Sequence, residues 1–388
     1  MAETNINMNA AHPIVIGAAD LPLHWGKVPE WLLPIMKRMA RAVIDVMLIE
    51  WGEDTLLERL GNPFWFQGLS NIIGMDWNSS GSTTVLISIL RQVLKPDDGL
   101  AVVGGKGRMA TATPSELRNL GKEFDLDIEG LIQASKLAAR VDSSLLLDGH
   151  QLYIHSMIVT RSGRWAVIQQ GMNTATRFAR RYHWVEPSSF ISDPHSAVAG
   201  VKGNAANVIE GSQEGTRKLM LDLLNQDPRK LINDYRKAQS MLRGGIDAWL
   251  YGRSFGAVSR NSGIIYYQPI SERGIKSMEE TAARKPGSLE EALLSGMGPS
   301  VSRALFLVCD LIYGSPPSLN DPVTHPYDPF KYAYAIGGKD GVPYPVNRRV
   351  AEEVINALEE VVLRAKLSEK DRGRAMHELS IMRSAAST

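Results

Sequence analysis

The chain has 388 residues, of which 44% are hydrophobic and 22% charged, a composition that excludes collagen-like, disordered and disulfide-scaffold proteins. Its 43 Lys and Arg residues are balanced by 42 Asp and Glu, so any contact with nucleic acid must come from a local basic patch. The length favours two domains.

The sequence shows no sign of membrane insertion or of an oxidising compartment. No run approaches the ~20 apolar residues that a membrane-spanning helix needs. The single cysteine, Cys309, cannot form an internal disulfide or a cysteine-rich zinc site. We therefore expect a cytoplasmic protein without membrane contact.

The N-terminal part of the chain is predicted to be mainly helical. Apolar residues recur at helical spacing from position 29 to 60 and again from 83 to 94, where Pro96 and Gly99 end the second run. Residues 1–21 precede this pattern, and we assign them to an N-terminal extension.

A β-hairpin is the clearest strand signal. Two β-rich runs, 152–160 and 164–171, are separated by the turn sequence Arg-Ser-Gly-Arg. A turn centred on the Ser-Gly step pairs His155 with Gln170. Strand alternation then places both side chains on the same face of the sheet.

Basic and aromatic residues alternate after the hairpin, in residues 177–184. Arg180 and Arg181 lie in this run. Two interpretations remain open for them: a second patch that contacts DNA, or partners in internal ion pairs.

A polar, Gly- and Asn-rich stretch at 200–215 is the best candidate for a linker, and helical periodicity dominates from Thr216 onward. The predicted fold class is therefore α+β. An α+β domain that holds the hairpin covers residues 22–211, and an all-helical domain covers residues 212–388.

The most specific local motif is Gly296-Met297-Gly298-Pro299, where one helix ends and another begins with proline at its first position. It resembles the helix-hairpin-helix of DNA-repair and recombination proteins. In that motif the glycines let the backbone approach a phosphate, and amides at the second helix's N-terminus hold it. An ordinary helical hairpin is the alternative. The residues assigned to DNA contact are Gly296, Met297, Gly298, Ser300 and Arg303.

One residue departs from the DNA-binding pattern of that motif. Ser300 follows the proline, where DNA-binding examples often carry Lys or Arg. Arg303, one helical turn later, supplies part of the positive charge that Ser300 lacks.

Several short blocks of sequence, spread along the chain, resemble the conserved blocks of a known protein family. They are Leu23-His24-Trp25-Gly26-Lys27-Val28-Pro29, Asn62-Pro63-Phe64-Trp65-Phe66-Gln67, Asp76-Trp77-Asn78-Ser79-Ser80-Gly81, Gly104-Gly105-Lys106-Gly107, Gln169-Gln170-Gly171-Met172-Asn173, Arg180-Arg181-Tyr182-His183-Trp184 and Gly337-Gly338-Lys339-Asp340-Gly341. Together they resemble an uncharacterised, largely archaeal family catalogued as domain of unknown function 763. This resemblance implies no established catalytic residue.

If the protein is catalytic, we place the site near His155 and Gln170, with Asp148 as a carboxylate ligand for Mg²⁺ or Mn²⁺. Asp76 and Lys106, each in a polar loop that contains glycine, are the alternates. The competing interpretation is structural: Asp148 caps the turn at Gly149, and His155 is a buried hydrogen-bonding residue.

Two function classes follow from these motifs. One is a metal-dependent nuclease of DNA repair or recombination. The other is a non-catalytic protein that recognises duplex or branched DNA through its phosphates. A small-molecule enzyme is a third and less favoured class. The expected partner is DNA, and homo-oligomerisation stays open.

Overall fold

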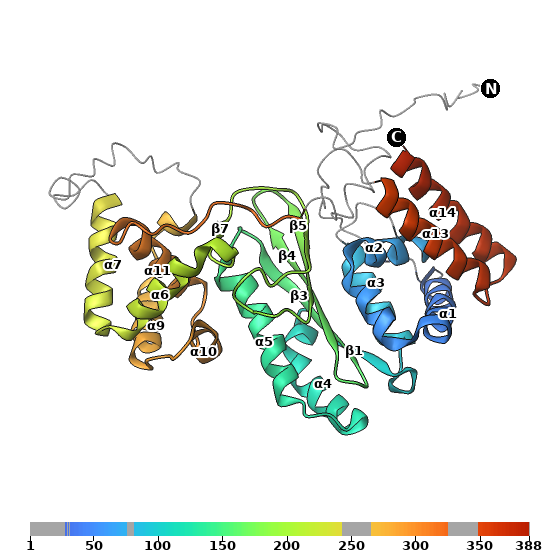
Figure 1. The fold of residues 1–388 in the computed structure, drawn as a ribbon, viewed down its shortest axis with the longest axis horizontal. Coiled ribbons are helices and arrows are strands. Elements are labelled where there is room, and N and C mark those ends of the chain that lie inside the picture. The colour runs from blue at the N-terminus through green and yellow to red at the C-terminus, as the bar shows by residue number, and fades with distance from the viewer. Residues whose placement is uncertain are drawn as a thin grey trace, which may run out of the picture.

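The computed structural model describes residues 28, 30, 32–75, 81–242, 265–324 and 348–387. It confirms the predicted α+β class, because helices surround a five-stranded antiparallel sheet (Figure 1). The strands are β1 (Leu100–Lys106), β2 (Leu146–Leu147), β3 (Gln151–Thr160), β4 (Trp165–Asn173), β5 (Phe178–Val185), β6 (Ala197–Ala199) and β7 (Ala206–Asn207). The described helices are α1 (Leu32–Gly61), α2 (Pro63–Ile72), α3 (Gly81–Val93), α4 (Arg108–Phe124), α5 (Glu129–Ser144), α6 (Glu214–Asn225), α7 (Pro228–Leu242), α9 (Glu272–Ala283), α10 (Leu289–Ser295), α11 (Pro299–Leu311), α13 (Arg348–Arg364) and α14 (Glu369–Ser387).

The sheet has the strand order β1-β3-β4-β5-β6, and β2 pairs with β7 in a separate two-stranded sheet. Helices cover both faces of the main sheet: α4 and α5 on one side, α1 to α3 on the other (Figure 1). Alternate strand residues therefore enter different cores. Val103 and Met157 pack in the core on the α4–α5 side, whereas Val102 and Ile158 pack in the core beneath α1 to α3.

The helices after residue 212 lie in two places. Helices α6 to α11 extend the core on the α4–α5 side, whereas α13 and α14 pack with α1 and α2 at the other end of the molecule (Figure 1). The division into domains at residue 212 stays a prediction. None of the described helices is both long and apolar enough to cross a membrane.

The hairpin of β3 and β4 forms as predicted, but its predicted register is wrong by one residue. His155 pairs with Gln169, and Gln170 pairs with Ile154. The reason is the length of the loop. Gly163 adopts a positive φ of 87°, and the N–H of Thr160 donates to the carbonyl of Arg164. This leaves a three-residue loop, whereas the predicted register requires a turn centred on the Ser-Gly step. A slip of one residue moves a side chain to the opposite face, so His155 and Gln170 do not share a site.

Candidate functional site

The turn between α10 and α11 has the local geometry that its sequence predicts. Gly296 ends α10 with a φ of 125°, which favours glycine, and Met297 is fully buried beneath the turn. Gly298 is the N-cap of α11, and Pro299 is its first residue. No side chain caps this helix. Its first-turn amides lack partners within the helix and are left for solvent or a ligand.

Arg284 lies beside this turn, and Arg273 and Arg303 belong to helices α9 and α11 that meet near it. The nearest atom to a side chain built at Gly296 is Nη1 of Arg284, and Ser300 contacts Gly274, which follows Arg273 in the chain. Arg303 lies one turn into α11. Within the described part of the chain, the side chains of Arg273, Arg284 and Arg303 form no ion pair or hydrogen bond. Their charge is therefore available to an anion.

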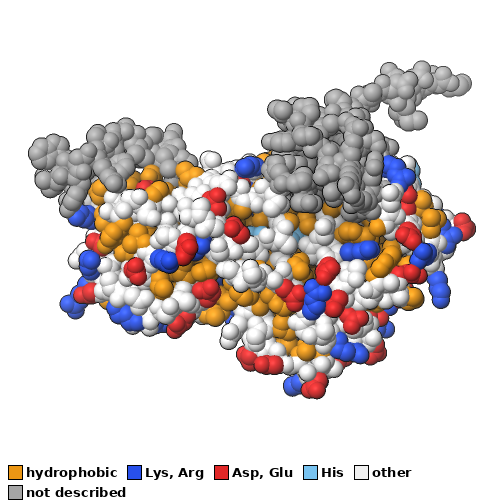
Figure 2. All heavy atoms as spheres, in the orientation of Figure 1, with side chains coloured by type: hydrophobic (Ala, Val, Ile, Leu, Met, Phe, Trp, Pro, Cys, Tyr) orange, Lys and Arg blue, Asp and Glu red, His pale blue; other side chains and the backbone are white. Residues whose placement is uncertain are grey.

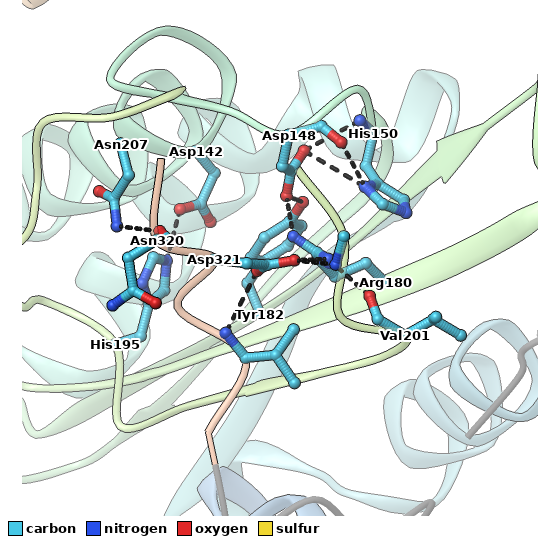
Figure 3. A network of polar contacts seen from close by, with 12 residues as sticks. Asp142, Asp148, His150, Arg180, Tyr182, His195, Val201, Asn207, Asn320 and Asp321 are labelled. Atoms are coloured by element: carbon cyan, nitrogen blue, oxygen red, sulfur yellow. Dashed lines mark hydrogen bonds and ion pairs between the residues drawn. The ribbon is translucent and has the colours of Figure 1, made fainter. Parts of the chain in front are cut away.

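A second polar centre lies inside the molecule, around Asp148 and Arg180 (Figure 3). Arg180 Nη1 donates to Asp148 Oδ2 at 2.7 Å, and Nη2 donates to Asp321 Oδ2 at 2.6 Å. The hydroxyl of Tyr182 also donates to Asp148 Oδ2, at 2.6 Å, and the amide of His150 donates to Oδ1 at 2.9 Å. Asp148 thus caps the turn at Gly149, as the structural interpretation of the sequence expects.

Burial and charge act in opposite directions on Asp148. Burial alone would raise the pKa of its carboxyl group, but the charge of Arg180 and the donors on His150 and Tyr182 outweigh this effect. The pKa of Asp148 is therefore held well below its usual range. The carboxylate is ionised at neutral pH and accepts hydrogen bonds from Arg180, Tyr182 and the amide of His150.

Arg180 also fastens a distant segment of the chain to the sheet. Asp321 belongs to the stretch 318–324, which follows α11 and returns to β6 and β7. Ser318 pairs with Asn207 of β7, and the amide of Thr324 donates to the carbonyl of Val198 in β6. We call residues 318–324 the strap. The Arg180–Asp321 ion pair joins the strap to β5.

Arg180 is 1% exposed and Arg181 is fully buried, so neither side chain lies on the surface in this structure. Arg180 is an internal ion-pair partner, one of the two interpretations that the sequence left open. Arg181 donates to Gln67 Oε1 at 2.9 Å and lies over the ring of Phe66. A DNA contact by either residue would first require the surrounding chain to open.

His155 belongs to a continuous chain of buried hydrogen bonds. Its Nε2 lies 2.7 Å from Ser135 Oγ, and its Nδ1 lies 2.9 Å from Gln169 Oε1. Gln169 in turn donates to Asp142, which also bonds to His195. Burial lowers the pKa of His155, only partly opposed by its bond to Gln169, so the imidazole is neutral at pH 7. The histidine is satisfied by protein groups on both ring nitrogens.

Gln170 lies on the other face of the sheet, among different neighbours. Thr83 and Tyr153 are its hydrogen-bond partners. Lys106, at the end of β1, has its Nζ 5.7 Å from the ring centroid of Tyr153 and is exposed to solvent. The structure thus brings Lys106 and Gln170 toward one tyrosine, while His155 and Asp148 lie elsewhere.

The described residues add no evidence for the predicted metal site. No three His, Cys, Asp or Glu side chains among them are grouped to hold a metal ion. Asp76, the alternate carboxylate, lies outside the described residues. A site for Mg²⁺ or Mn²⁺ stays a prediction.

The sequence did not single out the partners of the two buried aspartates. Asp321 is far along the chain from Asp148, and Asp142 meets His195 across 53 residues. Neither spacing matches a motif. The only available signal for Asp148 was its position before a glycine, which predicted the turn and not the ion pair.

Comparison with known proteins identifies one family. A family model described as "Protein of unknown function (DUF763)" matches residues 17–346. No curated protein matches the chain. No solved structure matches it either.

Proposed function

Since the chain belongs to the DUF763 family, whose function is unknown, its role has to be inferred from its own residues, and we propose that it binds DNA through backbone phosphates at the α10–α11 turn. In this proposal the turn acts as a helix-hairpin-helix. Two or more such contacts on a duplex or branched DNA would give affinity without reading base sequence.

The observation that carries the proposal is the open N-terminus of α11. Nothing in the described structure lies within van der Waals contact of a side chain built at Gly298, except the carbonyl oxygen of Gly296 at 4.0 Å. A phosphate can therefore approach the first-turn amides, where the helix dipole favours negative charge. The whole chain has a net charge of only +1, so a contact with DNA needs a local group of positive side chains. Arg284 and Arg303 supply such charge near α11.

The geometry supports binding more strongly than cleavage. Asp148, the predicted metal ligand, directs its oxygens at donors from Arg180, Tyr182 and His150. A divalent ion would have to displace these contacts and would be repelled by the positive charge of Arg180, whose Nη1 lies 2.7 Å from Asp148 Oδ2. We therefore place the non-catalytic alternative ahead of the nuclease.

A Gly298→Val variant tests the phosphate site without damaging the fold. Gly298 has a φ of −115° and a ψ of −177°, an extended conformation that valine adopts readily, and its surroundings are open. The free energy of unfolding should stay within about 1 kcal/mol of that of the unmodified protein. The isopropyl group should block the amides and weaken binding of a labelled 20-base-pair duplex by about tenfold or more, measured by fluorescence anisotropy, as the loss of a charged hydrogen bond of ~1.5 kcal/mol requires.

Gly373→Val provides the matched control. Gly373 also has open space around its α-carbon, but it lies in α14 at the far end of the molecule (Figure 1). The Gly373→Val variant should bind DNA as tightly as the unmodified protein. A folded Gly298→Val protein that binds as tightly as the control would refute the phosphate site. Parallel incubations of the labelled duplex with Mg²⁺, Mn²⁺ or EDTA should show binding without strand cleavage. Metal-dependent cleavage would instead favour the nuclease over the non-catalytic DNA-binding protein.

A further inference from the structure

A cavity of about 560 Å³ opens beside the Asp148–Arg180 cluster. Its volume lies within the range of roughly 300–1,000 Å³ that is usual for small-molecule sites. The β2–β3 connection, the β4–β5 turn, the loop before β7 and the segment at Ile265 all contribute to its wall. The lining residues used below are His150, Asn173, Phe178, Lys202, Tyr266 and Gln268.

The charges around this cavity cancel. Asp148 and Asp321 share the single guanidinium group of Arg180, which leaves one negative charge, and the exposed Lys202 balances it. Acidic and basic side chains are also intermixed on the described part of the face that Figure 2 shows. A charged ligand would lose its hydration in the cavity without meeting a net opposite charge. The balance therefore favours an uncharged ligand.

His150 supplies a hydrogen-bond acceptor to this cavity. Its side chain is only 9% exposed, and its Nδ1 lies 3.1 Å from the carbonyl oxygen of Asp148 and 3.3 Å from Oδ1 of the same residue. Because both neighbours of Nδ1 are acceptors, Nδ1 carries the proton of the neutral imidazole and Nε2 keeps its lone pair.

The lone pair of His150 Nε2 is open to a ligand. Nε2 lies on the far edge of the ring, directed away from Asp148 (Figure 3). It has no hydrogen-bond partner among the described residues and, unlike Nε of Arg180, it is not fully buried. Since the imidazole lines the cavity, a donor group of a bound molecule can reach this nitrogen.

Asn173 supplies a donor close to that acceptor. Its Oδ1 accepts from the amides of Ala175 and Thr176 at 3.0 and 3.2 Å, so the hydrogen bonds of the turn assign the orientation of its amide group. Nδ2 lies 2.9 Å from a Cβ atom built at Gly149, the residue before His150, and no group in the described part of the chain accepts from it. The free donor therefore lies beside the backbone that carries the free acceptor.

Aromatic and amide side chains complete the cavity. Phe178 and Tyr266 line it, and so does Gln268, whose exposed amide group has no partner among the described residues. A nucleobase has the complementary features, because its flat ring packs against aromatic side chains and its edge carries N–H donors next to acceptors. A monosaccharide has the hydroxyl groups but no flat ring.

We propose that this cavity binds an uncharged nucleobase, with an N–H group of the base donating to Nε2 of His150 and an acceptor of the base receiving from Nδ2 of Asn173. The proposal does not depend on the α10–α11 turn, because no residue of that turn lines the cavity. A free nucleoside and a base turned out of a nucleic-acid strand share this chemistry. Separate arms of the experiment distinguish the two sources.

Isothermal titration of the full chain with adenosine tests the proposal directly. His150→Phe keeps a ring of similar size but removes the acceptor. Asn173→Asp keeps the turn bonds of Oδ1 but replaces the donor by an acceptor. Each variant should weaken adenosine binding by about tenfold, because one hydrogen bond is lost and its partner group is left unsatisfied. Asn119→Asp, which adds the same charge at an exposed position of α4 outside the cavity, should leave the affinity unchanged.

Further ligands identify what the site recognises. AMP should bind no more tightly than adenosine, because the cavity has no net charge to attract a phosphate. A single-stranded oligonucleotide that displaces adenosine assigns the base to a nucleic-acid strand, and one that does not displace it assigns the site to the free nucleoside. Gly298→Val should bind adenosine as the unmodified protein does, which separates this proposal from the phosphate site at the α10–α11 turn.

Four results would overturn the proposal. They are the absence of a heat of binding at millimolar adenosine, glucose that binds as well as adenosine, AMP that binds more tightly than adenosine, and full adenosine affinity in both the His150→Phe and the Asn173→Asp protein. Urea unfolding of each variant shows that it is folded. If His150→Phe does not fold, Asn173→Asp alone decides, since it keeps the bonds of its turn.

Discussion

An Arg180→Met variant is expected to lose about 3–5 kcal/mol of unfolding free energy, the usual cost of removing one partner from a buried ion pair. The substitution keeps most of the side chain's volume but leaves Asp148 and Asp321 as unpaired charges, each in a side chain no more than 1% exposed. It also releases the strap from β5. The loss should appear in urea unfolding as a lower midpoint.

Arg164→Met is the matched control for this prediction. Arg164 pairs with three carboxylates, those of Asp54, Glu58 and Glu186, but all four side chains are partly exposed to solvent. Exposed pairs typically contribute about 0–1 kcal/mol, so the control should unfold close to the unmodified protein. Equal stability of the Arg180 and Arg164 variants would show that the buried cluster does not hold the strap in place.

Two buried aspartates are expected to differ in how replacement by asparagine changes the free energy of unfolding. The pKa of Asp148 is lowered, so its ionised form stabilises the fold at neutral pH, and Asp148→Asn should cost about 3 kcal/mol. Burial raises the pKa of Asp142 against the opposing effects of His195 and Trp184. Its neutral form therefore fits the fold better, and Asp142→Asn should be within about 1 kcal/mol of the unmodified protein at pH 7, or more stable.

The pH dependence of stability distinguishes the two residues further. The contribution of Asp148 is complete above the unfolded-state pKa of about 3.9 and is lost as the pH falls below it. The contribution of Asp142 has the opposite sign, because a raised pKa gives stability that is lost as the pH rises through it. Urea unfolding of both variants from pH 3 to 8 checks this. An Asp148→Asn protein with the same acid sensitivity as the unmodified chain would contradict the assignment.

The sequence predicted what depends on neighbours along the chain. The α10–α11 turn follows from its two glycines and a proline, which constrain the backbone locally whatever packs around them. The β3–β4 hairpin also followed from local alternation. Its register did not, because a loop of three residues and one of four look alike in sequence, and the difference decided which glutamine faces His155.

The buried polar centre could not be predicted because its partners are distant in sequence. Arg180 meets Asp148 across 32 residues and Asp321 across 141. Whether a basic side chain lies on the surface or inside is decided by what covers its strand. Arg180 is covered by the strap, and nothing in the pattern of residues 318–324 reveals that role.

The salt dependence of DNA binding tests the proposed function most directly. Each phosphate contact releases counterions, so the affinity of the unmodified protein for a duplex should fall steeply as salt rises. Arg303→Ala should weaken binding and reduce the slope of log affinity against log salt by about one. Arg118→Ala, at an exposed arginine of α4 that pairs with Glu129 of α5, should change neither quantity. An Arg303→Ala protein with unaltered affinity and unaltered slope would contradict phosphate binding at the α10–α11 turn.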